Sequence, residues 1–444
     1  MSVRVRYAPS PTGMPHVGNL RTALITWLFA RQNNGWFLLR IDDTDLERSK
    51  KEYEEGIEES LLWLGMNWDH KDWQRNRLDR YAEIIAELKQ GGRLYPCYET
   101  AEELALKRKS RLAQGLPPIY DRASLNLSEA QIAEYEAQGR KPHWRFKLNP
   151  TPIEWDDLIR GPVKIDGATM SDPVLIREDG SPLYHLCSVI DDIDYDITHI
   201  VRGEDHVSNT ATHIQMFEAI GHKPPQFVHL PLIADSEGGK LSKRLGSLSV
   251  QELRDNEGIE PMAVVSYMAR LGTSEPIEAL ESLTGLVDTF SFSKFSRNPP
   301  KFDPDEILRL NAKLVHDLPF ADAKDRLAAM GLSQIDEGFW NGVRANLERV
   351  SDIKTWWDIV QGPVKAEAID REFLANAANV LPAAPWNEQT WKTWTDAVKE
   401  QTGRKGKELF MPLRQALTGM DHGPELAGLL PLLGPEKVRE RLAA

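Results

Sequence analysis

Two short segments of this chain carry residue types suited to holding a nucleoside triphosphate. In YAPSPTGMPHVGNL (7–20), an apolar alternating run gives way to prolines and glycines around His16 and Gly18. In GGKLSKR (238–244), Ser242 is surrounded by cations, namely Lys240, Lys243 and Arg244. An imidazole and mobile ammonium groups that close on a pyrophosphate stabilise the charge that develops on it during group transfer.

The first segment lies where a strand is expected to turn into a helix. Residues 3–8 alternate between apolar and polar side chains, which predicts a strand, and residues 19–34 have the pattern of a helix that ends near Asn34-Gly35. A helix that begins near His16 offers free N–H groups and a partial positive charge to a phosphate. Gly18 would let an adenosine lie flat against the backbone. The alternative, a rigid turn with an exposed His16, fits this segment by itself equally well.

Further segments extend the pattern to a parallel α/β sheet. The run WFLLRIDDTD (36–45) predicts a buried strand that ends in acidic residues, and residues 50–64 predict an amphipathic helix with four inward side chains, Ile57, Leu61, Leu62 and Leu64. The pattern resumes at 182–235, with a helix from about Asn209 to Ile220. Strands alternating with helices predict a Rossmann-type sheet, in which ligands bind beyond the carboxyl ends of the strands.

Residues 94–181 interrupt this order and are interpreted as an inserted subdomain. The insertion contains a charged helical part (101–114) and strand-like pieces such as HWRFKL and GPVKIDG. From about residue 250 onward the pattern is almost entirely helical, and five tryptophans there are expected in the core: Trp356, Trp357, Trp386, Trp391 and Trp394. The predicted division is a split Rossmann domain (1–93 and 182–240), the insertion (94–181), a loop with a helical domain (241–318) and a second helical domain (319–444).

Composition narrows the class of protein. The chain has 444 residues, 41% of them apolar and 27% charged, and no apolar run reaches membrane-spanning length. Two cysteines, Cys97 and Cys187, exclude a disulfide framework and fit a reducing cytoplasm. A formal net charge of -13 argues only weakly against nucleic-acid binding, because binding depends on where Lys and Arg gather. Basic clusters occur at 107–111, 294–301 and 404–407, and each of them could also be a solvated face.

Taken together, these segments resemble the signatures of class I aminoacyl-tRNA synthetases. PSPTGMPHVGN resembles the HIGH signature of that class and KLSKR its KMSKS signature. The words RYAPSPTG, RIDDTD, YHLCSVIDD, IVRGEDH and HLPLI are similar to the glutamyl-tRNA synthetase branch, and FSRNPPKFD and LFMPLRQALTG extend the likeness over the whole chain. The resemblance implies a bacterial-type enzyme that activates L-glutamate with ATP and transfers it to the 3′ end of tRNA(Glu), tRNA(Gln) or both. It also implies that 94–181 binds the acceptor stem, 241–318 contacts the stem and 319–444 binds the anticodon.

The same resemblance implies which residues bind the substrates. Glutamate is expected to contact Arg6, Ala8, Ser10, Asp42, Tyr184, Ser188 and Arg202. Arg6 and Arg202 match carboxylate ligands, for which the planar guanidinium fork is suited. Asp42 matches the acid that holds the substrate ammonium, although many relatives have the longer Glu there, and Ser188 stands where some have Asn. ATP is expected to contact His16, Gly18, Asp205, Lys240 and Lys243, of which His16, Lys240 and Lys243 would act on the transferring phosphate.

No resident metal is predicted from the sequence. Magnesium is expected only as the partner of ATP, which needs few protein ligands. Some relatives hold zinc through Cys-x-Cys in the insertion, whereas here Cys97 is followed by Glu99, and one soft ligand cannot complete a tetrahedral site. The acidic run of Asp191, Asp192, Asp194 and Asp196 is expected to serve in turns and caps. One of Asp43 and Asp45 is likewise expected to cap the helix that follows.

Alternative functions predict a different C-terminal half. A glutaminyl-tRNA synthetase would have a β-rich anticodon region, whereas residues 320–444 have a helical pattern. A tRNA-modifying glutamyl transferase or a small-molecule nucleotidyltransferase would not need this helical half. A tRNA-binding paralogue without activity is also possible, but the sequence segments that match the family's active site look complete here. A cytoplasmic monomer is expected, and the residues that read the anticodon stay unassigned.

Overall fold

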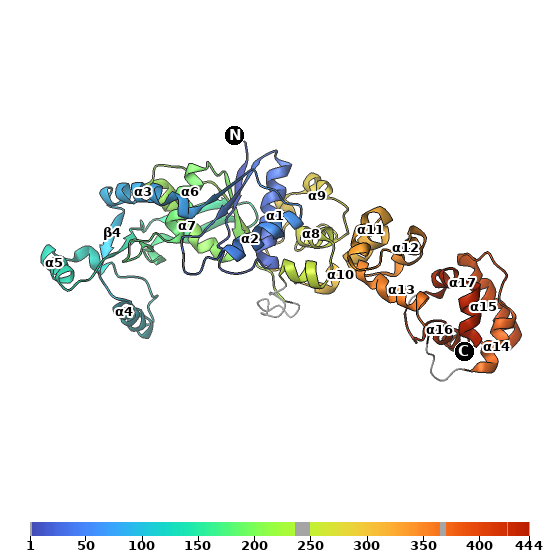
Figure 1. The fold of residues 1–444 in the computed structure, drawn as a ribbon. Helices are drawn as coiled ribbons and strands as arrows, with labels where there is room; N and C mark the ends of the chain where they lie inside the picture. The colour runs from blue at the N-terminus through green and yellow to red at the C-terminus, as the bar shows by residue number, and fades with distance from the viewer. Residues whose placement is uncertain (1, 236–248, 365–369, 424, 444) are drawn as a thin grey trace. The chain divides into compact units, whose positions relative to one another are not determined.

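The computed structural model describes residues 2–235, 249–364, 370–423 and 425–443 (Figure 1). The chain divides into two compact units, one of residues 1–252 with 265–303 and one of residues 253–264 with 304–444. The predicted phosphate-binding loop with Lys240, Ser242, Lys243 and Arg244 lies outside the described residues. The finer four-part division stays a prediction.

A parallel sheet forms the centre of the first unit. Strand β1 (Arg4–Tyr7) pairs with β2 (Trp36–Ile41), and β2 pairs with β3 (His70–Trp73). Strand β9 (His199–Gly203) pairs in the same sense with β10 (Gln226–Leu230). The amide of Thr198, just before β9, donates to the carbonyl of Arg4 at 2.9 Å, so the two pieces meet along β1 and β9. The predicted Rossmann-type sheet is therefore confirmed.

The helices around this sheet include the three that the sequence predicts at 19–34, 50–64 and 209–220. Helix α1 (Val17–Gln32) packs against β1, β2 and β9, and α6 (Tyr184–Asp194) packs against α3 (Leu78–Gln90) and α7 (Val207–Ala219). Helix α2 (Lys51–Trp63) follows β2. One inward side chain was predicted wrongly: Leu62 is 58% exposed, because it lies one residue outside the face formed by the buried Ile57, Leu61 and Leu64.

The insertion adds antiparallel strands and two helices to this unit. Strand β5 (His143–Phe146) pairs antiparallel with both β4 (Leu94–Cys97) and β8 (Val174–Ile176). The hairpin of β6 (Pro152–Asp157) and β7 (Gly161–Asp166) joins β10 where Asp157 faces Phe227. Figure 1 shows α4 (Ala101–Ala113) and α5 (Glu129–Ala137) beyond β4, away from the parallel sheet.

A polar cluster at Glu99 holds α4 against the strands of the insertion. The carboxylate, which follows β4, accepts hydrogen bonds from Ser124 Oγ at 2.6 Å, Tyr120 OH at 2.8 Å and Lys107 Nζ at 3.0 Å. Burial by itself raises the pKa of Glu99, but these hydrogen bonds outweigh it and lower the pKa to about 2. The ionised form of Glu99 is therefore the one that stabilises the folded insertion.

Acid is expected to loosen the insertion through Glu99. The folded pKa of about 2 lies below the ordinary value of 4.5, so the stability that Glu99 contributes is present above pH 4.5 and is lost as the pH falls toward 2. Hydrogen-exchange protection of β4 and β5, corrected for intrinsic rates, should fall across that window. The control Glu99→Gln should show lower protection near neutral pH, and the two proteins should converge in acid. A constant difference between them would contradict the role of the charge.

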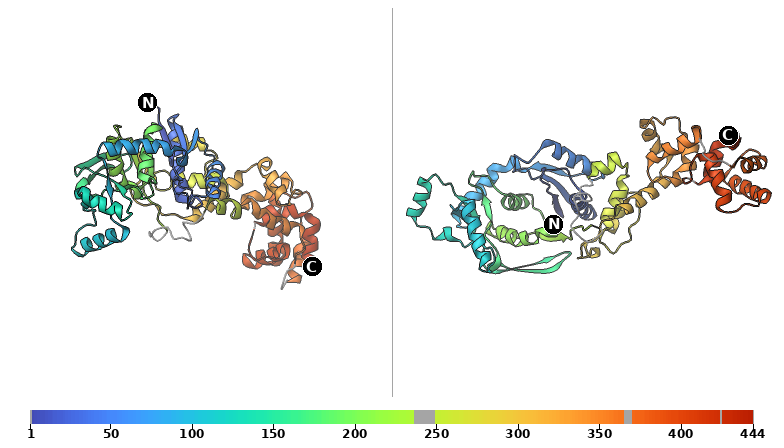
Figure 2. Two further views of the ribbon diagram at one scale, coloured as in Figure 1. Left: turned by 60° about the vertical axis from the view of Figure 1, so that its left-hand side comes forward. Right: turned by 90° about the horizontal axis from the view of Figure 1, so that it is seen from below.

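The second unit is helical throughout its described residues, as Figure 2 shows from two directions. Its helices, after α8 (Pro261–Arg270), which contains the unit boundary, are α10 (Pro304–Asp317), α11 (Phe320–Ala329), α12 (Glu337–Val343), α13 (Ile353–Gln361), α14 (Arg371–Asn379), α15 (Glu388–Thr402), α16 (Lys407–Thr418) and α17 (Leu426–Ala443). In the first unit, α9 (Leu283–Thr289) follows α8. A search of the described helices finds none with the length and apolar character needed to span a bilayer.

The tryptophans of the second unit lie in or against its core, as predicted. Trp356 and Trp394 are buried, whereas Trp357, Trp386 and Trp391 are half-buried and pack against the same cluster. Trp394 is fully enclosed, and its Nε1 donates to the carbonyl of Ala377 at 2.8 Å. The role of these tryptophans in the helical unit is therefore packing, and no catalytic role is assigned to them.

Candidate active site

The carboxyl ends of the parallel strands bring the predicted glutamate ligands into one buried cluster. Arg6 lies near the end of β1, Asp42 directly after β2, and Arg202 near the end of β9. All three are less than a tenth exposed. Burial, and to a smaller extent the charge of Arg6, lowers the pKa of Arg202, so the two guanidinium groups act on each other. This edge of the sheet is where ligands bind in open α/β folds.

Arg40 ties this cluster to α6. It is fully buried on β2, and its Nε and Nη2 donate to the two oxygens of Asp42 at 2.7 and 3.1 Å. Its Nη1 donates to Asp192 Oδ1 at 2.9 Å, and Nη2 also reaches Ser188 Oγ at 3.1 Å. Arg6 Nε donates to the same Asp192 oxygen at 3.0 Å. Burial raises the pKa of Asp42 to about 6, although Arg40 opposes this shift.

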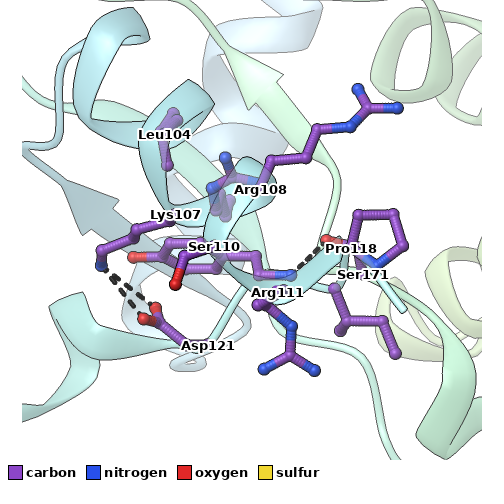
Figure 3. Close-up of a pocket in the computed structure, with 11 residues that line it drawn as sticks. Leu104, Lys107, Arg108, Ser110, Arg111, Pro118, Asp121 and Ser171 are labelled. Carbon is purple, nitrogen blue, oxygen red and sulfur yellow. Dashed lines mark hydrogen bonds and ion pairs between the residues drawn. The ribbon is translucent and has the colours of Figure 1, made fainter. Parts of the chain in front are cut away.

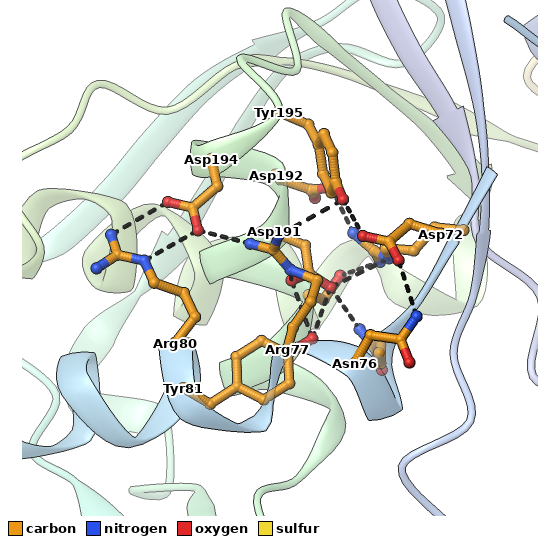
Figure 4. A network of polar contacts seen from close by, with 12 residues as sticks. Asp72, Asn76, Arg77, Arg80, Tyr81, Asp191, Asp192, Asp194 and Tyr195 are labelled. Carbon is orange, nitrogen blue, oxygen red and sulfur yellow. Dashed lines mark hydrogen bonds and ion pairs between the residues drawn. The ribbon is translucent and has the colours of Figure 1, made fainter. Parts of the chain in front are cut away.

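The acidic run on α6 belongs to ion-pair networks, which corrects the predicted turn and cap roles (Figure 4). Asp191 accepts hydrogen bonds from three side chains, Gln74, Arg77 and Tyr81, at 2.6 to 3.0 Å. Asp194 accepts from Arg77 and Arg80. The prediction failed for Asp191, Asp192 and Asp194 because they lie inside α6, which ends at Asp194, and bond to arginines of other elements. Asp196 does lie in a turn, with φ 51. Within the described part of the chain, no group of three or more His, Cys, Asp or Glu side chains could hold a metal ion.

The predicted helix cap at Asp43 or Asp45 is also wrong. Helix α2 begins at Lys51 with Lys50 as its N-cap, several residues beyond both acids. Asp43 is buried instead and accepts from the backbone amide of Arg75 at 2.9 Å and from its Nη1 at 2.7 Å. Asp45 accepts from Arg48. Asp43 therefore fastens the loop after β2 to the segment after β3, whereas the bond of Asp45 stays within that loop.

Arg202 is held by neutral groups alone. Its nitrogens donate to His229 Nε2 at 3.3 Å, Tyr184 OH at 3.4 Å, His213 Nδ1 at 3.4 Å and Thr210 Oγ1 at 2.7 Å. It forms no ion pair with any carboxylate in the described ranges, whereas Arg6 is paired with Asp192. A buried guanidinium without a counter-ion is costly by itself, so the site favours an incoming carboxylate.

His16 caps α1 and presents one ring nitrogen outward. Its Nδ1 accepts from the backbone amide of Asn19 at 3.4 Å, so the neutral ring carries its proton on Nε2. A side chain at Gly18 would lie 3.2 Å from the His16 ring. Asp205, in the short helix after β9, is exposed. The five predicted ATP contacts are therefore placed in part. His16 and Gly18 share one turn, Asp205 follows β9, and Lys240 and Lys243 lie outside the described residues.

The remaining predicted glutamate contacts follow from β1 and α6. Ala8 is half-buried and Ser10 is exposed, and both lie in the loop that the amide of Asp42 ties down by donating to the carbonyl of Pro9 at 3.0 Å. Tyr184 is the first residue of α6, and Ser188, fully buried, lies one turn further along. The sequence had not singled out Arg40 or His213. A basic residue inside the apolar run WFLLRI was the available signal for Arg40.

A separate cavity of about 310 Å³ lies in the insertion (Figure 3). Its wall includes four cationic side chains, Lys107, Arg108, Arg111 and Arg145, and none of the residues predicted to bind glutamate or ATP. Arg145 lies over the ring of Tyr120 at 4.2 Å. Lys107 is paired with Asp121 at 3.2 Å. The basic cluster that the sequence places at 107–111 thus contributes to a hollow rather than to a uniformly solvated face.

Known proteins match this chain over its whole length. The family "tRNA synthetases class I (E and Q), catalytic domain" matches residues 2–309, and "Anticodon binding domain" matches residues 342–444. A "Glutamate--tRNA ligase" of Azospirillum brasilense is 57% identical, covering 100% of this chain and 99% of that protein, and a "Glutamate--tRNA ligase 1" of Maricaulis maris is 53% identical over 99% of each. The crystal structure of a glutamate tRNA ligase from Elizabethkingia meningosepticum in complex with its amino acid matches with a TM-score of 0.86 and 28% identity, covering 100% of this chain and 98% of that one.

Proposed function

Because this chain belongs to the class I tRNA synthetases for glutamate and glutamine, we propose that it is a glutamate–tRNA ligase that uses ATP to join L-glutamate to tRNA(Glu). The single observation that carries the choice of amino acid is Arg202, a buried cation whose hydrogen-bond partners among the described residues are all neutral. The second carboxylate of glutamate, on its side chain, can supply the missing charge, whereas the side-chain amide of glutamine is neutral and cannot.

The reaction has two steps, and in both the substrates supply the reacting groups. A carboxylate oxygen of glutamate attacks the α-phosphorus of ATP, the bond to the bridging oxygen breaks, and pyrophosphate leaves. A hydroxyl of the 3′-terminal ribose then attacks the acyl carbon of glutamyl-adenylate, loses its proton, and AMP leaves. The protein contributes position and charge stabilisation, as in other phosphoryl-transfer enzymes. Magnesium enters as the partner of ATP.

The glutamate site is assigned to the cluster at the carboxyl ends of the strands. Arg6 and Arg202 pair with the substrate carboxylates, and Tyr184 positions Arg202 and contacts the amino acid. Asp42 accepts from the ammonium with lone pairs that its two bonds to Arg40 leave free. Ala8 and Ser10 line the pocket. Ser188 accepts a hydrogen bond from Arg40 and so helps to position the arginine that holds Asp42.

The ATP site is assigned to the turn at the start of α1. Nε2 of His16 donates to a phosphate oxygen, Gly18 leaves room for the adenosine, and Asp205 contacts the ribose. Lys240 and Lys243 close on the pyrophosphate. The cap that His16 forms with Asn19 supports this assignment, because it fixes the tautomer in which Nε2 is a donor.

The tRNA is assigned to the insertion and the helical unit. The cationic cavity supports acceptor-stem binding by residues 94–181, and residues 241–318 and 319–444 are assigned to the stem and the anticodon. We also propose a cytoplasmic monomer without zinc. The engagement of Glu99 by Ser124, Tyr120 and Lys107 supports the last point, since a zinc ligand would need those lone pairs.

Charging assays test these assignments. Purified tRNA(Glu) should accept radiolabelled glutamate in the presence of ATP, and glutamine should not replace the glutamate. A parallel assay with tRNA(Gln) shows whether that tRNA is charged as well. Pyrophosphate exchange with and without tRNA shows whether activation needs the tRNA. Charging of neither tRNA with glutamate would overturn the proposal.

A further inference from the structure

Hydrogen bonds around Arg202 fix the protonation of two buried histidines. Arginine can only donate, so the nitrogens that face it, His213 Nδ1 and His229 Nε2, must both be unprotonated. His213 then carries its proton on Nε2, which lies 3.0 Å from His185 Nδ1. His229 carries its proton on Nδ1, which lies 2.5 Å from Asp157 Oδ2. Each ring therefore has one tautomer that satisfies both of its neighbours.

Both rings lie fully inside the protein and come from different elements. His213 on α7 and His229 on β10 are each 0% exposed. They approach Arg202 from two directions, one at Nη1 and the other at Nε, while Thr210 holds Nη2. The guanidinium is thus fixed in its plane by acceptors that carry no charge.

A neutral acceptor and a carboxylate have opposite consequences for a substrate. Asp192 holds Arg6 by an ion pair and thereby offsets part of its charge. The imidazoles orient Arg202 without placing a carboxylate in contact with it, and Asp192 acts on it only from a distance, so most of its charge is left to an incoming carboxylate. His185 continues the series of hydrogen bonds from Arg202 through His213. Burial lowers the pKa of His185 to about 4, so this ring is neutral as well.

We propose that His213 and His229 are positioning residues that aim Arg202 at a carboxylate of glutamate without themselves placing a negative charge against it. This inference rests on the proposed function, which makes Arg202 a carboxylate ligand. Because both rings are fully buried behind Arg202, they are assigned no contact with the substrate in this inference. Each histidine contributes an uncharged nitrogen that accepts a hydrogen bond from Arg202 in a fixed direction.

A pair of nearly isosteric variants tests the charge alone. In His213→Asn the amide oxygen can take the place of Nδ1 as a neutral acceptor, whereas His213→Asp places a carboxylate there. We expect the KM for glutamate to stay within about threefold of wild type in His213→Asn and to rise by about tenfold to a hundredfold in His213→Asp. The KM for ATP should change little in both, measured by pyrophosphate exchange with tRNA(Glu) present.

The possible outcomes separate this inference from the proposed function. Circular dichroism shows whether both variants are folded. A similar KM for glutamate in two folded variants would overturn the inference that the histidines act as neutral acceptors for Arg202. A wild-type protein that shows no glutamate-dependent exchange with any tRNA would overturn the proposed function instead. Should His213→Asp fail to fold, His229→Gln serves as the second test. Its amide oxygen replaces Nε2, so the KM for glutamate should stay within about tenfold of wild type, and a larger rise would count against the inference.

Discussion

Replacing Arg202 by leucine is expected to lower kcat/KM for glutamate by about a hundredfold to a thousandfold. The variant removes a buried positive charge that forms no ion pair among the described residues, and it leaves His213 Nδ1 and His229 Nε2 facing an apolar side chain. Pyrophosphate exchange at varied glutamate, with tRNA(Glu) present, measures the loss. Most of it should appear in the KM for glutamate rather than in that for ATP.

Arg202→Lys is the matched control for this prediction. Lysine keeps a positive charge but cannot donate along two parallel directions, so its loss should be smaller than that of leucine. A leucine variant with an unchanged KM for glutamate would remove Arg202 from the site. Equal losses for lysine and leucine would assign the effect to geometry and not to charge.

The fold could be predicted from sequence because each element carries a local signal. The predicted bounds agree within a few residues with β1, β2, α1, α2, α4 and α7, which follow from alternation at 3–8, the apolar run from residue 36 and helical periodicity elsewhere. Strand β3 and helix α3 were not predicted. The errors arose where a local pattern has two solutions. Leu62 is apolar but lies off the buried face, and Asp43 satisfies the composition of a cap although the helix begins at Lys51.

The site could be predicted only in part. The family likeness pointed to Arg6, Asp42 and Arg202, whose convergence follows from parallel strands ending at one edge. Their partners could not be predicted, because the contacts join positions far apart in the chain, such as Arg40 with Asp192 and Arg202 with His229. No periodicity within one element reports such pairs. The loop with Lys240 and Lys243 stays a prediction.

Replacing Arg40 by methionine is expected to destabilise the first unit by about 3–5 kcal/mol. Arg40 is fully buried, and it neutralises Asp42 and Asp192 and lies 3.5 Å from Asp191. Burial alone would lower the pKa of Arg40, but these carboxylates raise it above its ordinary value. Methionine fills much of the same volume without charge, so three carboxylates would be left with less compensation in the interior.

The loss of stability in Arg40→Met should be larger at high pH than at low pH. In Arg40→Met the buried carboxylates can escape their repulsion only by binding protons, so the destabilisation should shrink as the pH falls from about 8 toward 5. Hydrogen exchange of the β2 amides measures it locally, which avoids assuming one transition for a chain with two units. The triple variant Arg40→Met, Asp42→Asn, Asp192→Asn should recover part of the stability even at high pH, because it removes two of the charges that methionine leaves unpaired. A loss that is the same at both pH values would mean that Arg40 stabilises β2 by packing, and the carboxylates would then be neutralised by Arg6 and Arg77 without it.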